Sequence, residues 1–129
     1  MNINNDASTL FNNNYNCCQS IVASLCEPLG LSQDQAKKLT AAFGGGIFYQ
    51  GQTCGAVTGA YMILGLFYAS SDSDDFIVKE KFKQIIMEFN TKFISANGSI
   101  ICKELLKHDI TSQEGKLAIE ENNLFSTLC

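Results

Sequence analysis

At the centre of the chain stands Gly51-Gln52-Thr53-Cys54-Gly55-Ala56-Val57-Thr58-Gly59, inside a stretch from Leu39 to Ser71 that contains no charged residue. Seven of the ten glycines fall in this stretch. Thr53 is a suitable helix N-cap, so we expect a helix to begin at Cys54 and to run to about Ala69. Because this segment is apolar on all sides, we expect it to lie at the centre of the fold.

Cys54 is expected in the first turn of that helix, where free backbone amides and the helix dipole favour an anion. The sequence therefore predicts a stabilised thiolate at Cys54. Gly55 and Gly59 lie four residues apart, so one side of the helix next to the sulfur carries no side chains. The triple glycine Gly44-Gly45-Gly46 ends the preceding helix. A neighbouring backbone or a compact cofactor is expected to approach closely at these glycines.

The rest of the pattern predicts further helices and no sheet. Their approximate ranges are 12–29, 32–43, 100–107 and 111–121, the last opened by the capping-box pattern Thr111-Ser112-Gln113-Glu114, with one more between a cap at Asp72 or Ser73 and the turn at Asn97. Ser32 and Gln35 form a capping-box pattern, and Phe48 and Tyr49 are expected to point inward. Residues 1–8 are expected to form a loose tail. The prediction is one all-α domain over residues 1–129, with about five or six helices around the glycine-rich one.

Four segments of the chain resemble motifs of one family. Cys54-Gly55-Ala56-Val57-Thr58-Gly59 resembles the CGAxxG signature of the C_GCAxxG_C_C proteins, and Asn16-Cys17-Cys18-Gln19 resembles their Asn-Cys-Ala-Gln. Phe43-Gly44-Gly45-Gly46 and Cys102-Lys103-Glu104-Leu105-Leu106 resemble two further family segments. Cys129 falls where the fourth family cysteine is expected.

The resemblance implies a redox-active protein, with Cys17, Cys54, Cys102 and Cys129 as its four family cysteines. Similar segments accompany the haem-binding parts of split-Soret cytochromes, where an iron–sulfur cluster is suspected. Four thiolates suit such a cluster, so we expect these cysteines to be its ligands and the protein to transfer electrons. The glycines expected to make room for the cofactor are Gly44, Gly45, Gly46, Gly55 and Gly59.

Two alternatives remain open at this stage. One is metal-free thiol–disulfide exchange, with Cys54 as nucleophile and Cys17 as a second redox thiol. The other is a structural zinc site, or a binding module whose cysteines only pack. Cys18 and Cys26 are eight residues apart on one helical face and are interpreted as small core residues. Whether the protein is an enzyme stays open.

Several classes of function are not supported. No C-x-x-C or C-x-x-C-H motif is present, so thioredoxin-like chemistry and covalent haem are not expected. The net charge is −4 and arginine is absent, which argues against nucleic-acid binding. No apolar run reaches the roughly 20 residues of a membrane span, and no secretory signal is recognised. We therefore expect a cytoplasmic protein whose partner is a redox protein or a small thiol. The sequence does not decide whether the protein forms a homodimer.

Overall fold

The computed structural model describes residues 3–129, with side chains from Asp6 onward. This part of the chain forms eight α-helices and one 3-10 helix, and no strand occurs in it. The all-α prediction is therefore confirmed, although the helices are shorter and more numerous than expected. Their bounds are α1 Ile3–Asn12, α2 Cys17–Leu25, η1 Glu27–Leu29, α3 Gln33–Leu39, α4 Gly55–Tyr68, α5 Phe76–Asn97, α6 Cys102–Leu106, α7 Gln113–Glu121 and α8 Leu124–Leu128.

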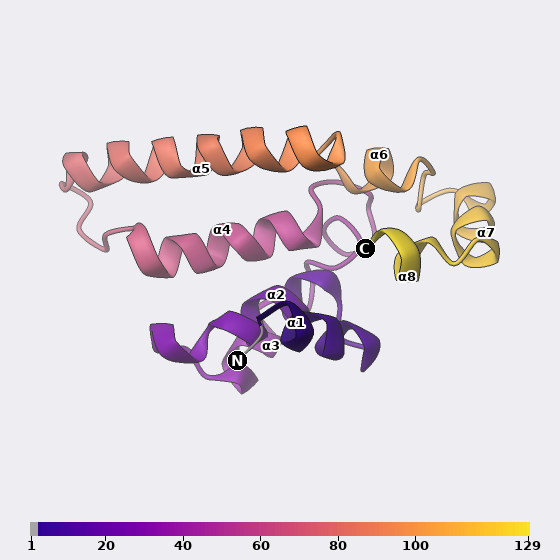
Figure 1. Cartoon of the computed structure of the whole chain (residues 1–129), viewed down its shortest axis with the longest axis horizontal. Coiled ribbons are helices and arrows are strands. Elements are labelled where there is room, and N and C mark those ends of the chain that lie inside the picture. Colours follow the sequence, from indigo (N-terminus) through magenta and orange to yellow (C-terminus); the bar gives the residue numbers. More distant parts are fainter. Residues whose placement is uncertain (1–2) are drawn as a thin grey trace.

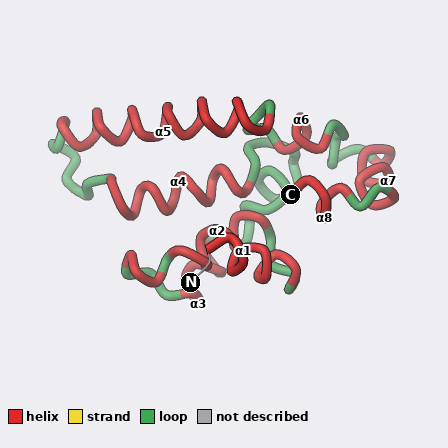
Figure 2. Tube along the Cα trace, viewed as in Figure 1, coloured by secondary structure: helices red, strands yellow, loops and turns green. Residues whose placement is uncertain are grey.

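The helices form three groups. α1, α2 and α3 pack against one another on one side of α4, and α5 lies antiparallel to α4 on the other side (Figure 1). The short helices α6, α7 and α8 gather at one end of this arrangement (Figure 1). The long loop between α3 and α4 passes through the point where the three groups meet, next to the C-terminus (Figure 2).

The N-terminal region differs from the prediction. Residues 3–8 are not a loose tail but the first part of α1, which packs against α2. The helix expected over residues 12–29 is divided, because Asn14 adopts a left-handed φ of 73° and separates α1 from α2. Asn16 then caps α2 in a reciprocal capping box: its side chain accepts from the Gln19 amide (2.8 Å), and its own amide donates to the Gln19 side chain (2.9 Å).

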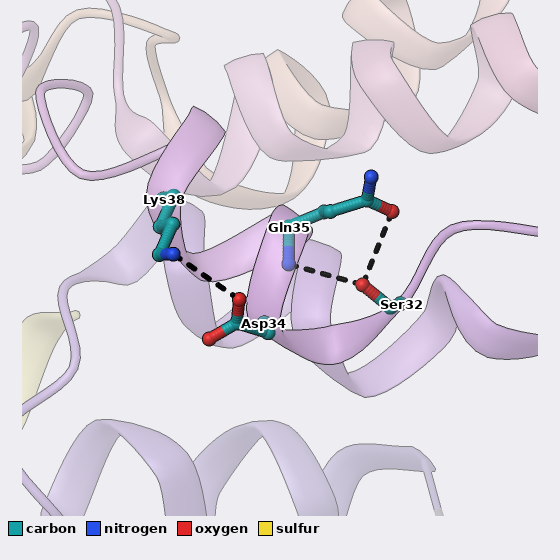
Figure 3. Close-up of polar contacts among 4 residues, drawn as sticks. All are labelled: Ser32, Asp34, Gln35 and Lys38. Carbon is teal, nitrogen blue, oxygen red and sulfur yellow. Dashed lines mark hydrogen bonds and ion pairs between the residues drawn. The ribbon is translucent and has the colours of Figure 1, made fainter.

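The start of α3 is as predicted. The Ser32 hydroxyl accepts a hydrogen bond from the Gln35 amide (3.1 Å) and donates to the Gln35 side chain (Figure 3). Asp34 and Lys38 form an exposed ion pair at 3.3 Å on the same helix (Figure 3), worth only a few tenths of a kcal/mol. The helix ends at Leu39, earlier than expected, because the chain then enters the turns that lead to the glycine-rich loop.

Two buried clusters hold the fold together. The first lies between α2 and α3 and contains Cys18 and Cys26, both 0% exposed, which confirms their interpretation as core residues. The second joins α6 to α7 and is built on Cys102, Leu106 and Ile119. Within residues 3–129, no helix is both long and apolar enough to cross a membrane.

The prediction for α4 is only half correct. Gly55, Val57 and Gly59 are buried, but no residue from Ala60 to Ile101 is. The second half of α4 contacts α5 along one side, where Tyr61 donates a hydrogen bond to Asn90, and its Met62 and Ile63 pack against the α2–α3 cluster. α4 is apolar on all sides, yet only its N-terminal part is buried, and its last three residues are exposed.

Candidate four-cysteine site

The four family cysteines line one cavity of about 710 Å³. Cys17 is the first residue of α2, Cys54 immediately precedes α4, Cys102 is the first residue of α6, and Cys129 follows α8. These positions are far apart in the sequence, so only the fold brings them together. The structure thus assembles the group of cysteines that the sequence singled out.

A short pairing of two segments places Cys54 beside Cys102. Thr53 and Ile101 form an isolated antiparallel bridge. The Cys54 amide donates to the Ile100 carbonyl (2.7 Å), and the Cys102 amide donates to the Gln52 carbonyl (2.6 Å). Each cysteine therefore follows a bridge residue, and the backbone fixes their separation.

This bridge also corrects the predicted helix start. Thr53 does not cap α4, because its backbone is paired with Ile101. Cys54 itself occupies the N-cap position, without a capping hydrogen bond from its side chain, so it lies just before the first turn. The Cys54 sulfur still reaches the amides of Ala56 and Val57.

Glycines let the chain close around two of the thiols. A Cβ atom on Gly55 would collide with the Cys17 sulfur and would lie 3.0 Å from the Phe43 carbonyl oxygen. A Cβ atom on Gly46 would lie 2.6 Å from the Cβ of Cys102. The contact at Gly46 is too short for a real side chain and the contacts at Gly55 are unusually tight, so both positions favour glycine on steric grounds.

The other expected glycines have different neighbours. Gly45 lines the cavity together with Gly55. Gly44 lies against the Asn16 side chain, where an added Cβ would be 2.5 Å from that residue's Cβ. Gly59 lies against α2, with 3.1 Å between its added Cβ and the Cβ of Ile21. Gly44 and Gly59 are therefore contacts between segments rather than parts of the cavity wall.

A left-handed turn borders the cavity. Residues 45–49 have φ values of 64°, 72°, 63°, 48° and 62° in sequence, and the Tyr49 amide donates to the Gly44 carbonyl (2.9 Å). Left-handed backbone disfavours residues with a Cβ by about 1–2 kcal/mol each, and Ile47 is β-branched as well. Phe48 and Tyr49 are 62% and 49% exposed, so the expectation that they point inward is wrong.

The side chains of the cavity wall include no acidic or basic group besides the thiols and the tyrosines. Among its described lining residues, none has a carboxylate, ammonium or imidazole side chain. Lys37 lies just outside, with its Nζ 4.5 Å from the centre of the Tyr15 ring. Besides the side-chain amides of Asn14, Asn16, Gln19 and Asn97, six aromatic residues line the wall, namely Phe11, Tyr15, Phe48, Tyr49, Phe93 and Phe125.

The sequence reasoning missed Asn16 as a site residue. Its side chain caps the helix that begins with Cys17 and donates to the carbonyl of Ala41 (3.1 Å), so it connects this helix to the loop around the cavity. The spacing of Asn16 and Gln19 is a capping-box signal that could have placed the helix start at Cys17. No local signal marks the aromatic wall, because its members come from several distant segments.

The Cys54 thiol is not stabilised as a thiolate. Burial raises its pKa above the ordinary value, the Ala56 and Val57 amides lower it less, and the neighbouring Cys17 raises it further. The prediction of a stabilised thiolate at this position is therefore wrong for the metal-free protein. The helix start does act in the expected direction, but loss of solvation outweighs it.

The thiols of Cys102 and Cys129 show the same tendency. Burial, followed by repulsion from Cys54 and Cys17, raises the pKa of Cys102 to about 12. Cys129 is exposed as a residue, yet its thiol lines the cavity, and burial together with the other three cysteines raises its pKa to about 12. The four sulfurs are thus within electrostatic reach of one another.

The four sulfurs do not converge on a single point. Among the residues that the structure describes, no three cysteine, histidine or acidic side chains lie close enough together to hold one metal ion. The thiols are instead distributed around the cavity wall. A site of this kind could bind a cofactor with several attachment points.

The protein is therefore a small helical protein in which four cysteines from separate segments line one cavity. The chain is a member of the family described as "Putative redox-active protein (C_GCAxxG_C_C)", whose profile matches residues 15–129. The resemblance seen in the sequence is therefore confirmed. Comparisons with curated proteins and with solved structures find no significant match.

Proposed function

We propose that this protein transfers electrons through an iron–sulfur cluster held by Cys17, Cys54, Cys102 and Cys129. The observation that carries this proposal is that four thiols from four separate segments line one cavity. Membership of a redox-active family supports redox use of these thiols. Cys18 and Cys26 belong to the apolar core and take no part.

The donor set and the room available fit a cluster. In a cubic cluster each thiolate binds a different iron, so the four sulfurs need not meet at one point. A single zinc ion would need all four within bonding distance of one centre, which the arrangement of the thiols does not favour. The cavity volume of about 710 Å³ leaves space for a cofactor larger than one ion.

The surrounding residues suit an electron-transfer centre. When bound, the cluster supplies one-electron oxidation and reduction. The amides of Ala56 and Val57 lie near enough to the Cys54 sulfur to lower its pKa, and amides that donate hydrogen bonds to sulfur tune the potential of a cluster. The cavity wall places aromatic rings and side-chain amides around the thiols, and such surroundings influence the potential of a cluster.

Thiol–disulfide exchange is less well supported. The attacking species in exchange is a thiolate, and the raised pKa values of Cys54 and Cys102 keep these thiols protonated near neutral pH. Coordination to iron removes the thiol protons outright and relieves the repulsion among the sulfurs. The same raised pKa values are therefore less of an obstacle to a cluster than to exchange.

The test is purification without oxygen, followed by visible absorption and by iron, sulfide and zinc analysis. We expect a brown protein, and we expect Cys54→Ser and Cys102→Ser each to lose the iron and to unfold at lower temperature. Cys26→Ala is the matched control, because it removes a buried thiol outside the cavity, and it should keep the iron. A colourless native protein that contains zinc or no metal would rule out the cluster, whereas full iron content in Cys102→Ser would rule out Cys102 as a required ligand.

A further inference from the structure

Many apolar side chains of the α4–α5 hairpin are not packed against the rest of the chain. α5 has 22 residues, none of them buried, and one face carries a regular apolar stripe. The stripe residues are only half-buried and pack mainly against α4; they are Val78, Phe82, Ile85, Ile86, Phe89 and Phe93. Two helices by themselves cannot enclose such a stripe, whereas four helices can.

Seven large apolar side chains are also openly exposed on the hairpin. We call them the hairpin surface: Leu66, Phe67, Tyr68, Phe76, Ile77, Met87 and Ile94. Their exposed fractions run from 43% to 73%. Five of the seven flank the turn that joins the two helices, at the end of the hairpin farthest from α6 (Figure 1).

Summed over its residues, the hairpin surface approaches the area that one partner of an interface buries, and consecutive residues such as Leu66, Phe67 and Tyr68 place that area on more than one side of the hairpin. If a large apolar side chain contributes roughly 200 Å², the hairpin surface exposes roughly 800 Å² of side-chain area. Each partner of a standard protein–protein interface buries about 800 Å². Apolar patches larger than a few hundred Å² are uncommon on monomeric proteins and mark contact sites.

We infer that the hairpin surface is the interface of a homodimer, in which two α4–α5 hairpins pack into a four-helix bundle. Each copy supplies two helices, α4 and α5, with incompletely buried apolar faces. The α4 and α5 helices of a second copy would complete a bundle of four and bury these faces. Residues 72–97 carry four lysines and five acids, so two copies meet without strong charge repulsion. An anionic membrane is a poorer occupant, because Asp72, Asp74 and Asp75 lie at the tip of the hairpin.

An apolar groove adjoins the hairpin surface. It has a volume of about 320 Å³, and its wall includes Leu39, Met62 and Leu66. Leu66 belongs both to the groove and to the hairpin surface, so the two are continuous. A protruding side chain beside a groove is the combination that a two-fold contact uses, because each copy then inserts into the other.

Dimerisation can be tested separately from the cysteine site. Only the C-terminal end of α5 borders the cavity, at Phe93 and Asn97, whereas Phe76 and Ile77 lie at its other end. A helix of 22 residues is about 33 Å long, so changes at the tip leave the thiols in place. Loss of the dimer and loss of the cofactor are therefore distinguishable results.

The experiment is sedimentation equilibrium of the full chain under reducing conditions, at about 1–100 µM protein. We expect the native protein at twice the chain mass of 14.1 kDa. The double variant Phe76→Glu with Ile77→Glu should weaken association by about 100-fold or more. Because both side chains are exposed in the single chain, the variant should keep its helix content. Leu117→Glu, at a 51% exposed leucine on α7, is the control and should remain dimeric.

Hydrogen exchange gives an independent measurement on the native protein. We expect the amides of α5 to become better protected as the protein concentration rises, and those of α7 to stay unchanged. A native protein that is monomeric at every concentration would overturn the inference. So would a double variant that dimerises normally, or a monomer that binds anionic lipid vesicles through this surface.

Discussion

The three glycines of α4 should respond differently to the same substitution. An alanine at Gly55 would place its Cβ against the Cys17 sulfur, and 3.0 Å from both the Cys18 nitrogen and the Phe43 oxygen. The last two atoms belong to the backbone and cannot rotate away. Gly55→Ala is therefore expected to lower the free energy of unfolding by about 1–3 kcal/mol, the usual range for overpacking.

The other two glycines provide graded controls on the same helix. At Gly59 the nearest atom to an added Cβ is 3.1 Å away, so a moderate clash offsets the gain of about 1 kcal/mol from replacing a helical glycine. At Gly65 the only neighbour is the Phe82 ring at 3.9 Å, an ordinary contact. Gly65→Ala should therefore be stabilising by up to about 1 kcal/mol, and Gly59→Ala should change little.

Urea unfolding followed by circular dichroism measures all three free energies. Thiol labelling of the metal-free protein adds a second readout, because Gly55→Ala should also displace the Cys17 sulfur. A Gly55→Ala protein as stable as the native one would refute the reasoning. It would mean that the segments around Cys17 and Cys54 can separate at little cost.

Two further predictions follow from the cap and from the thiols. Asn16→Ala removes the side-chain cap of α2 and the hydrogen bond to the Ala41 carbonyl, so the free energy of unfolding should fall by about 1–2 kcal/mol. Asn13→Ala, at an exposed asparagine without such hydrogen bonds, is the control and should leave the free energy unchanged in the same urea titration. In metal-free protein the thiol pKa rises from 9.0 to about 11 at Cys18 and about 12 at Cys102, so unfolded thiols release protons first as the pH rises. Stability should then be highest below pH 9 and should fall from pH 9 toward 12, and a flat profile in urea titrations across that window would contradict the burial of these thiols.

Local signals in the sequence were sufficient for much of the fold. Ser32 starts α3 because its hydroxyl accepts from an amide three residues later, and this interaction involves only neighbours. The spacing of Cys18 and Cys26 placed both on one apolar face, and both are buried. The same kind of signal at Asn16 and Gln19 marks the start of α2.

The errors concern properties that depend on distant residues. Thr53 has the right side chain for a cap, but Ile101 pairs with its backbone, and nothing near Thr53 predicts that partner. The composition of α4 shows that it is apolar but not which of its sides are covered. The thiolate at Cys54 was inferred from its own helix, whereas its pKa is set mainly by burial among segments that are remote in the sequence.

The left-handed turn at residues 45–49 has a consequence for chemical synthesis. Mirror-image amino acids prefer the positive φ values that Ile47, Phe48 and Tyr49 adopt, so D-residues at these three positions should fit the native backbone better than the natural ones. Ligation of synthetic peptides joins them at a cysteine, and Cys54 offers such a junction shortly after the turn. A semisynthetic protein could thus carry a mirror-image segment at the edge of its cavity, resistant there to proteases and otherwise built from ordinary residues.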